Sequence, residues 1–250
     1  MLQEAHDKLG ATLSKRDNGF RWRGREISRI EGLSDAVFAF AITLLVVSLE
    51  PPKRFEELQH LMHGFLSFAL CFTALLLIWH SQYIYFRRYA LDDAKSFILN
   101  AFLLFLVAFY VYPLRFLMST LINMLTRYHE VDKNGTPIEY IQAGDWTSLM
   151  LIYSVGFIAI YFVFALLYLH AYSKRDDLDL NDLERFDTRN VIFEHSIMIG
   201  IGALSAAFAL AQMPSLSGMA YLLIGPFQTV WGMMNGKRRR ALESAIPAPT

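Results

Sequence analysis

The stretch RIEGLSDAVFAFAITLLVVSLE, residues 29–50, begins with charged residues, becomes an apolar run and keeps one aspartate, Asp35, inside that run. The apolar part is long enough for a helix to cross the roughly 30 Å hydrocarbon core of a bilayer. An ionised carboxylate at such a depth costs roughly 2.5–3.5 kcal/mol on insertion scales. The stretch therefore predicts a membrane helix whose carboxylate needs polar partners.

Apolar stretches of similar length recur along the 250-residue chain, which is 54% hydrophobic and has a mean hydropathy of +0.32. This pattern predicts an all-α, multi-pass membrane protein rather than a soluble domain. Two prolines fall inside the stretches, where neighbouring helices tolerate a kink. The six predicted spans cover about residues 30–49, 62–86, 97–122, 146–171, 191–212 and 216–235.

Lysine and arginine residues are divided unequally between the two sides that six spans create. Eighteen of them lie on the side that holds both termini, four lie in the loops of the other side, and one lies inside the third span. Since cytoplasmic segments carry the excess of positive charge, we expect both termini in the cytosol. We expect residues 1–25 to be a cytosolic N-terminal segment, either disordered or a cap, residues 26–236 to be the membrane domain, and residues 237–250 to be a cytosolic basic tail.

Motifs for enzymatic or metal chemistry do not occur in the sequence. It has no Gly-rich phosphate loop, no HExxH, no CxxC and no G-x-S-x-G pattern, and its seven histidines are scattered. The single cysteine excludes an intramolecular disulfide. A net charge of zero does not favour a nucleic-acid partner. We therefore expect no catalytic site, no metal site and no cofactor.

Asp35 needs partners from other helices. Arg29 lies six residues earlier, about 240° round an ideal helix, so a pair within the helix is disfavoured. Trp79 and His80, late in the second span, and Asn100, early in the third, lie at a similar predicted depth. A purely structural role is the simpler interpretation of His80 and Asn100. The predicted interhelical polar network consists of Arg29, Ser34, Asp35, Trp79, His80 and Asn100.

A second stripe of the first span contains Ala36, Phe40, Thr43 and Val47, whose spacing of four, three and four residues places them on one helix face. Asp35 lies roughly 140° from Phe40 around the helix. If Asp35 faces partner helices, this stripe faces lipid, a packed core, or a narrow axis among several copies of the chain. Spacing alone favours packing or lipid.

At these residues the sequence resembles the prokaryotic members of the lysosomal potassium channel family, the transmembrane protein 175 type. The family's first-helix motif, Arg-x-x-x-Phe-Ser-Asp before an apolar stretch, corresponds to residues 29–35, with Leu33 in the phenylalanine position. A Trp-His pair late in the second helix is matched by Trp79 and His80. A third-helix asparagine followed by a proline is matched by Asn100 and a proline in the same span.

The resemblance implies a homotetrameric cation channel in a lipid bilayer, with six helices per subunit and the first helix around a central pore. Potassium and other monovalent cations would be the permeating species, without a cofactor. The family's hydrophobic constriction and its threonine for potassium preference fall by position at Phe40, Thr43 and Val47. Phe40 departs from the aliphatic residue usual in the family, so four copies would either block more fully or rotate as a gate. A short chain with one set of spans indicates the inner (plasma) membrane of a bacterium.

Two other classes compete with a passive potassium-preferring channel. A proton or organic-cation transporter would need an ionisable relay through the middle of the membrane and would favour internal repeats, and neither is visible in the sequence. A membrane enzyme would need an acid, base or metal set around a cavity. Asp35, His80 and His195 lie towards the cytosolic ends of their spans instead. We therefore expect a channel and not an enzyme.

Overall fold

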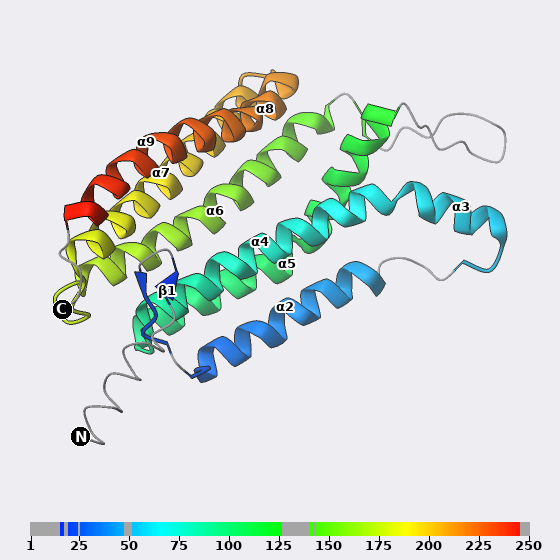
Figure 1. Ribbon diagram of the computed structural model, residues 1–250. Coiled ribbons are helices and arrows are strands. Elements are labelled where there is room, and N and C mark those ends of the chain that lie inside the picture. Colours follow the sequence, from blue (N-terminus) through cyan, green and yellow to red (C-terminus); the bar gives the residue numbers. More distant parts are fainter. Residues whose placement is uncertain are drawn as a thin grey trace.

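The computed structural model describes residues 16–17, 20–24, 26–47, 52–126, 141–142 and 144–245. The predicted end of the first span at 48–49, most of the N-terminal segment and the last five residues of the predicted tail lie outside these ranges. The described chain is almost entirely helical, which confirms the all-α class (Figure 1). Its five long helices are α2 (Arg29–Val47), α4 (Phe65–Tyr89), α5 (Ala94–Thr126), α6 (Asp145–Ser173) and α7 (Asp182–Leu210).

All five long helices are long and apolar enough to cross a membrane, which confirms a multi-pass membrane protein. They run side by side in one bundle, in which α6 packs on both α5 and α7 (Figure 1). Two small elements flank α2. A hairpin of β1 (Arg16–Asp17) and β2 (Phe20–Arg21) precedes it, and the nine-residue helix α3 (Phe55–His63) follows it.

The C-terminal stretch differs from the single span predicted over residues 216–235. It forms α8 (Pro214–Ala220), the 3-10 turn η1 (Tyr221–Leu223) and α9 (Ile224–Ala245). Proline favours the first turn of a helix, and Pro214 stands there in α8. The basic residues predicted to begin a separate tail are instead part of α9, because lysine, arginine, alanine and glutamate all favour the helical state.

The first membrane helix, α2, lies at one edge of the bundle and packs on α4 and α5 (Figure 1). Its buried residues Phe38, Ala41 and Leu45 recur every three or four positions and so form one stripe towards the core. On α5, Leu103 and Val107 are also buried in this core. One side of α2 therefore packs against its own subunit, and the other side makes no packing contact with the described residues of that subunit.

Close packing between α5 and α6 depends on Gly156. A Cβ atom at this position would lie 2.1 Å from Cε1 of Tyr110, whose ring therefore occupies the place of a side chain. Small residues at such contacts let membrane helices approach each other closely, which matters because lipid gives no hydrophobic drive for association.

We predict that Gly156→Ala lowers the thermal stability of the protein by about 1–3 kcal/mol, the usual cost of overpacking a core. The control is Gly200→Ala in α7, where a Cβ would meet no atom within 4 Å. Thermal unfolding in detergent, followed by tryptophan fluorescence, measures both. A Gly156→Ala protein as stable as the Gly200→Ala protein would contradict this packing.

Asp93 joins the start of α5 to the end of α6. Its Oδ1 accepts a hydrogen bond from the backbone N–H of Ser96 at 2.9 Å, while Oδ2 lies 2.8 Å from Nε2 of His170 and 2.8 Å from Nζ of Lys174. Burial raises the pKa of Asp93, but hydrogen bonds from Lys174, Ser96 and His170 outweigh burial and hold that pKa well below its usual range.

The depressed pKa makes a pH-dependent contribution to stability. Above the pKa of the unfolded chain, about 3.9, the Asp93 carboxylate stabilises the fold, and this contribution is lost as pH falls through the lower pKa of the folded state. We predict that Asp93→Asn lowers the melting temperature at pH 7 and that the difference from wild type narrows below about pH 4. Melting curves from pH 7 to pH 3 measure it, with the exposed neighbour Asp92 changed to Asn as control. A difference that stays constant with pH would contradict the assignment.

Candidate functional site

The face of α2 opposite its buried stripe is exposed within one subunit. Phe40 is 58% exposed and Val47 is 69% exposed, and Ala36 and Thr43 are exposed as well. No other described part of the chain covers this face. The hydroxyl of Thr43 donates to the carbonyl of Ala39 at 2.8 Å, so its proton is engaged and its oxygen lone pairs are left for an electropositive ligand. The stripe predicted from the sequence is thus an outward-facing surface of the subunit.

Behind this face, a buried chain of hydrogen bonds joins α2 to α5 and α4. Nδ2 of Asn100 donates to Oγ of Ser34 at 2.9 Å, and Oδ1 of Asn100 accepts from Nε2 of Gln82 at 2.6 Å. Ser34 in turn donates to the carbonyl of Ile30 at 2.7 Å. All three polar side chains are buried, and each has its partner inside the protein. Such a satisfied network fixes the relative rotation of the three helices.

Asp35 has its own partner on α4. Nε1 of Trp79 donates to Oδ1 of Asp35 at 2.7 Å. The indole of Trp79 also stacks on the ring of Tyr83, with centroids 5.7 Å apart, and Tyr83 meets Trp22 edge to face at 6.1 Å. The carboxylate is therefore held by a donor on a neighbouring helix whose indole is itself stacked on an aromatic ring.

Two residues of the predicted network lie apart from these hydrogen bonds. Arg29 is the first residue of α2, and its exposed side chain makes no hydrogen bond or ion pair with the described part of the chain. His80 follows Trp79 by one residue and so points about 100° away from it. Its ring is exposed and stacks on Tyr83 instead, with centroids 6.3 Å apart.

Other residues of the site were missed from the sequence. Gln82 lies one helical turn beyond Trp79, on the same side of α4, and that spacing was the available signal. Glu31 of α2 pairs with Arg87 of α4, with Oε1 and Nη2 2.9 Å apart. Glu31 also completes a capping box, in which its backbone N–H donates to Oγ of Ser28 at 3.2 Å and its Oε2 accepts from the N–H of Ser28 at 2.8 Å. The Ser-x-x-Glu spacing is a recognised helix-start signature.

Known potassium channels match this chain in sequence. Residues 29–110 match the family model described as the endosomal/lysosomal potassium channel TMEM175. A protein named Potassium channel, from Marivirga tractuosa, is 35% identical over 252 residues, which cover 94% of this chain and 98% of that protein. A potassium channel from Chamaesiphon minutus is 34% identical over 110 residues, which cover 41% of this chain and 54% of that protein.

A solved structure supports the same relationship. The crystal structure of a variant of the potassium channel MtTMEM175, in complex with a nanobody–MBP fusion protein, matches with a TM-score of 0.77 and 36% identity. The match covers 89% of this chain and 99% of that chain. Similarity that extends over nearly the whole length of both a sequence relative and a structural relative includes α2 and the helices that hold it. The chain belongs to the TMEM175 family of potassium channels.

Proposed function

We propose that four copies of the chain assemble around a central axis, with α2 of each subunit lining a pore that passes potassium passively and in preference to sodium. The observation that carries this proposal is the exposed face of α2 at the edge of the subunit, described above. A closed ring of identical subunits would cover that face with its own copies and leave no unpaired edge. The names of the relatives, which are potassium channels, support the same function.

The side chains of this face divide the pore into levels. A ring of Phe40 would form an apolar constriction, which resists ions because water does not fill a narrow apolar passage. One helical turn along α2, four Thr43 hydroxyls would replace part of the water shell of a cation. Since these oxygens carry no net charge, they bind the ion weakly enough for it to leave. Val47 would line the next level of the pore.

The polar contacts of Ser34, Asp35, Trp79 and Asn100 serve this pore as a scaffold. Ser34 and Asn100 are buried inside the subunit, and the exposed Asp35 is bound by Trp79 of α4, so in this proposal these contacts contribute no atoms to the axis. Their contribution is to hold α2 at one rotation, which decides which residues face the other three copies. The polar network therefore sets the pore lining indirectly.

Residues 214–239 supply the sixth crossing in this proposal. α8 begins just after the end of α7, whereas Nε of Arg239, late in α9, lies 3.0 Å from Oδ1 of Asp187, near the start of α7. The chain therefore returns along α7 to the side from which α7 set out (Figure 1). Hydroxyl contacts fix its first turns, because Ser217 bonds to Ser205 at 2.8 Å and Tyr221 to Ser154 at 3.1 Å. Six crossings place both termini on one side, and the lysine and arginine distribution makes that side the cytosol of a bacterial cell.

We predict that Thr43→Ala reduces the ratio of potassium to sodium permeability by about fivefold, the equivalent of about 1 kcal/mol of discrimination. The purified protein in liposomes, with flux driven in turn by potassium and sodium gradients, measures the ratio. Thr73→Ala is the matched control, because Thr73 on α4 is exposed and donates to its own helix at 2.8 Å in the same way. An unchanged ratio in Thr43→Ala would remove Thr43 from the filter. Wild-type vesicles that carry protons but no potassium would reject the channel itself.

We predict that Phe40→Ala raises the potassium flux, because removing four rings widens the constriction and lets water fill it. Planar-bilayer recordings of single channels measure the conductance directly. Phe65→Ala, an exposed phenylalanine at the start of α4, is the control for loss of an aromatic ring outside the proposed pore. A conductance unaffected by Phe40→Ala would mean that the constriction lies at another level of α2.

A further inference from the structure

We infer that the segment before α2 is a positioning element for ion conduction. This segment, which we call the strap, consists of residues 20–24 and 26–28, and it ends where α2 begins. It is bound to three other parts of the chain, namely the start of α7, the turn between α6 and α7, and the end of α4. The inference rests on the proposed function, because it assigns the strap a role in a pore lined by α2.

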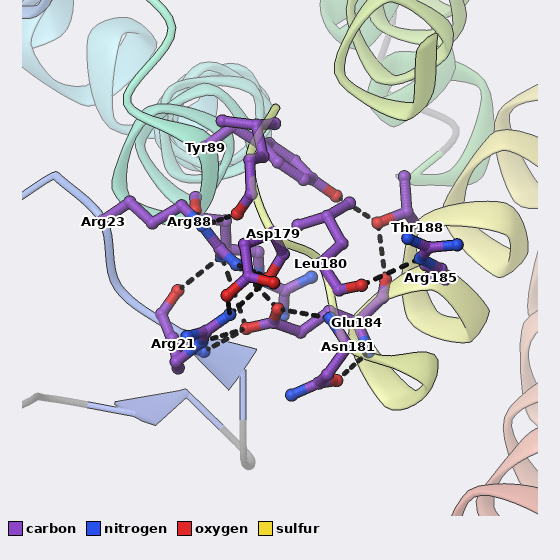
Figure 2. Close-up of polar contacts among 11 residues, drawn as sticks. Arg21, Arg23, Arg88, Tyr89, Asp179, Leu180, Asn181, Glu184, Arg185 and Thr188 are labelled. Atoms are coloured by element: carbon purple, nitrogen blue, oxygen red, sulfur yellow. Dashed lines mark hydrogen bonds and ion pairs between the residues drawn. The ribbon is translucent and has the colours of Figure 1, made fainter. Parts of the chain in front are cut away.

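The strongest contact of the strap is with Glu184 in the first turn of α7. Oε2 of this fully buried carboxylate lies 2.7 Å from Nη2 of Arg23, and Oε1 accepts from the backbone N–H of Arg21 at 2.9 Å (Figure 2). Glu184 also caps α7 together with Asn181, whose Oδ1 accepts from the N–H of Glu184 at 2.8 Å. If the strap detached, a buried carboxylate would lose its cationic partners, which is strongly unfavourable.

The same two arginines bind the turn between α6 and α7. Nε of Arg23 donates to the carbonyl of Leu178 at 2.9 Å. Arg21 and Arg23 both donate to the carbonyl of Asp179 (Figure 2). Asp179 has a φ of 48°, a left-handed conformation that aspartate tolerates better than most residues. The strap arginines therefore use side-chain charge and backbone carbonyls together, so their guanidinium groups are held at fixed positions.

The strap is also bound to the end of α4. The backbone N–H groups of Arg23 and Gly24 donate to the carbonyl of Arg87 at 3.0 and 3.1 Å, and Nη1 of Arg87 donates to the carbonyl of Gly24 at 2.9 Å. The ring of Phe20 is fully buried, and Cζ of the Arg88 guanidinium lies over it, 4.8 Å from the centroid of the ring. A Cβ at Gly24 would lie 2.9 Å from the carbonyl oxygen of Phe86, so the backbones of the strap and α4 approach too closely for any other residue.

Two connections lead from the strap to the pore helix. Arg87, which holds Gly24, also pairs with Glu31 at 2.9 Å, and Glu31 closes the capping box at the start of α2. The second connection runs through Trp22, Tyr83 and Trp79, whose rings contact one another in sequence before Trp79 donates to Asp35. Both connections end in the first two turns of α2, so a shift of the strap moves the start of that helix along its axis or rotates it.

This arrangement makes Glu31 and Arg87 positioning residues for conduction, although neither faces the proposed pore. Removing the pair frees the start of α2 to rotate. The four copies of Phe40 and the four copies of Thr43 then turn away from the axis of the proposed pore. The exposed fraction of each side chain in the pair is 9%, so solvent screens the interaction little. The pair is therefore a largely buried link between the strap and the proposed pore helix, not an exposed surface ion pair.

The first experiment compares Glu31→Gln and Arg87→Gln with the charge-reversed double variant Glu31→Arg/Arg87→Glu in planar bilayers. Wild type is first shown to conduct potassium, so a failure of the proposed function is seen before any variant is read. We expect each single variant to change the open probability or the potassium-to-sodium ratio by about tenfold, within the usual range of coupling between two sites. We expect the double variant to recover most of the wild-type behaviour. Arg239→Gln, which breaks an ion pair between α9 and α7, is the control and should leave both quantities unchanged.

The second experiment changes no charge. Gly24→Ala pushes the strap away from α4, whereas the control Gly236→Ala, in α9, adds a methyl group where no atom lies within 4 Å. We expect Gly24→Ala to change open probability or ion preference in the same direction as Arg87→Gln, with Gly236→Ala like wild type. The inference is overturned if wild type conducts and any one of Glu31→Gln, Arg87→Gln and Gly24→Ala folds but keeps the open probability and ion preference of wild type. It is equally overturned if the single variants lower only the melting temperature or yield.

Discussion

The amide of Asn100 is the contact on which the arrangement of the first three membrane helices depends. Lipid offers no hydrogen-bond partner, so a polar side chain on a membrane helix must find one on another helix. Asn100 satisfies Ser34 of α2 with its donor and Gln82 of α4 with its acceptor, and so it fixes three helices with one side chain. Because one face of α2 is held in this way, the face with Phe40 and Thr43 is turned away from its own subunit.

The strap applies the same constraint next to the first turn of α2. There the groups that must be paired are charged, and the buried carboxylate of Glu184 binds two arginines that precede α2 in the sequence. The hydrogen bonds around Asn100 and the contacts of the strap both involve α4, on which Trp79, Gln82 and Arg87 lie within three turns. α4 thus positions α2 together with Asn100 of α5, although in this proposal α4 lines no part of the pore.

Part of this architecture follows from the sequence alone. Apolar stretches of membrane-spanning length locate five helices, and the cost of a carboxylate in lipid identifies Asp35 as a residue that needs partners. Depth along the predicted spans selects Trp79 and Asn100 as candidates. It does not decide which side chains touch, because that depends on the rotation of each helix about its own axis.

The contacts that the sequence did not predict share a physical cause. Arg21 and Glu184 are separated by 163 residues, and nothing in either local pattern points to the other. Pairing of Glu31 with Arg87 needs the end of α4 to lie beside the start of α2, which only the packed bundle shows. The C-terminal stretch is similar, since its sequence predicts one span over residues 216–235 whereas the chain there forms α8, η1 and α9.

The placement of polar contacts along α2 has a mechanical consequence. The contacts of Glu31 with Arg87, of Ser34 with Asn100 and of Asp35 with Trp79 all lie in the first two turns of α2. Further along the helix, Phe38, Ala41 and Leu45 are buried in the apolar core. A rod that is held at one end is displaced most at its other end. The lateral displacement of α2 should therefore grow from Phe40 through Thr43 to Val47. In the proposed pore, the larger displacement of this end would make the level of Val47 the most flexible part, and the level nearest the polar contacts the most rigid.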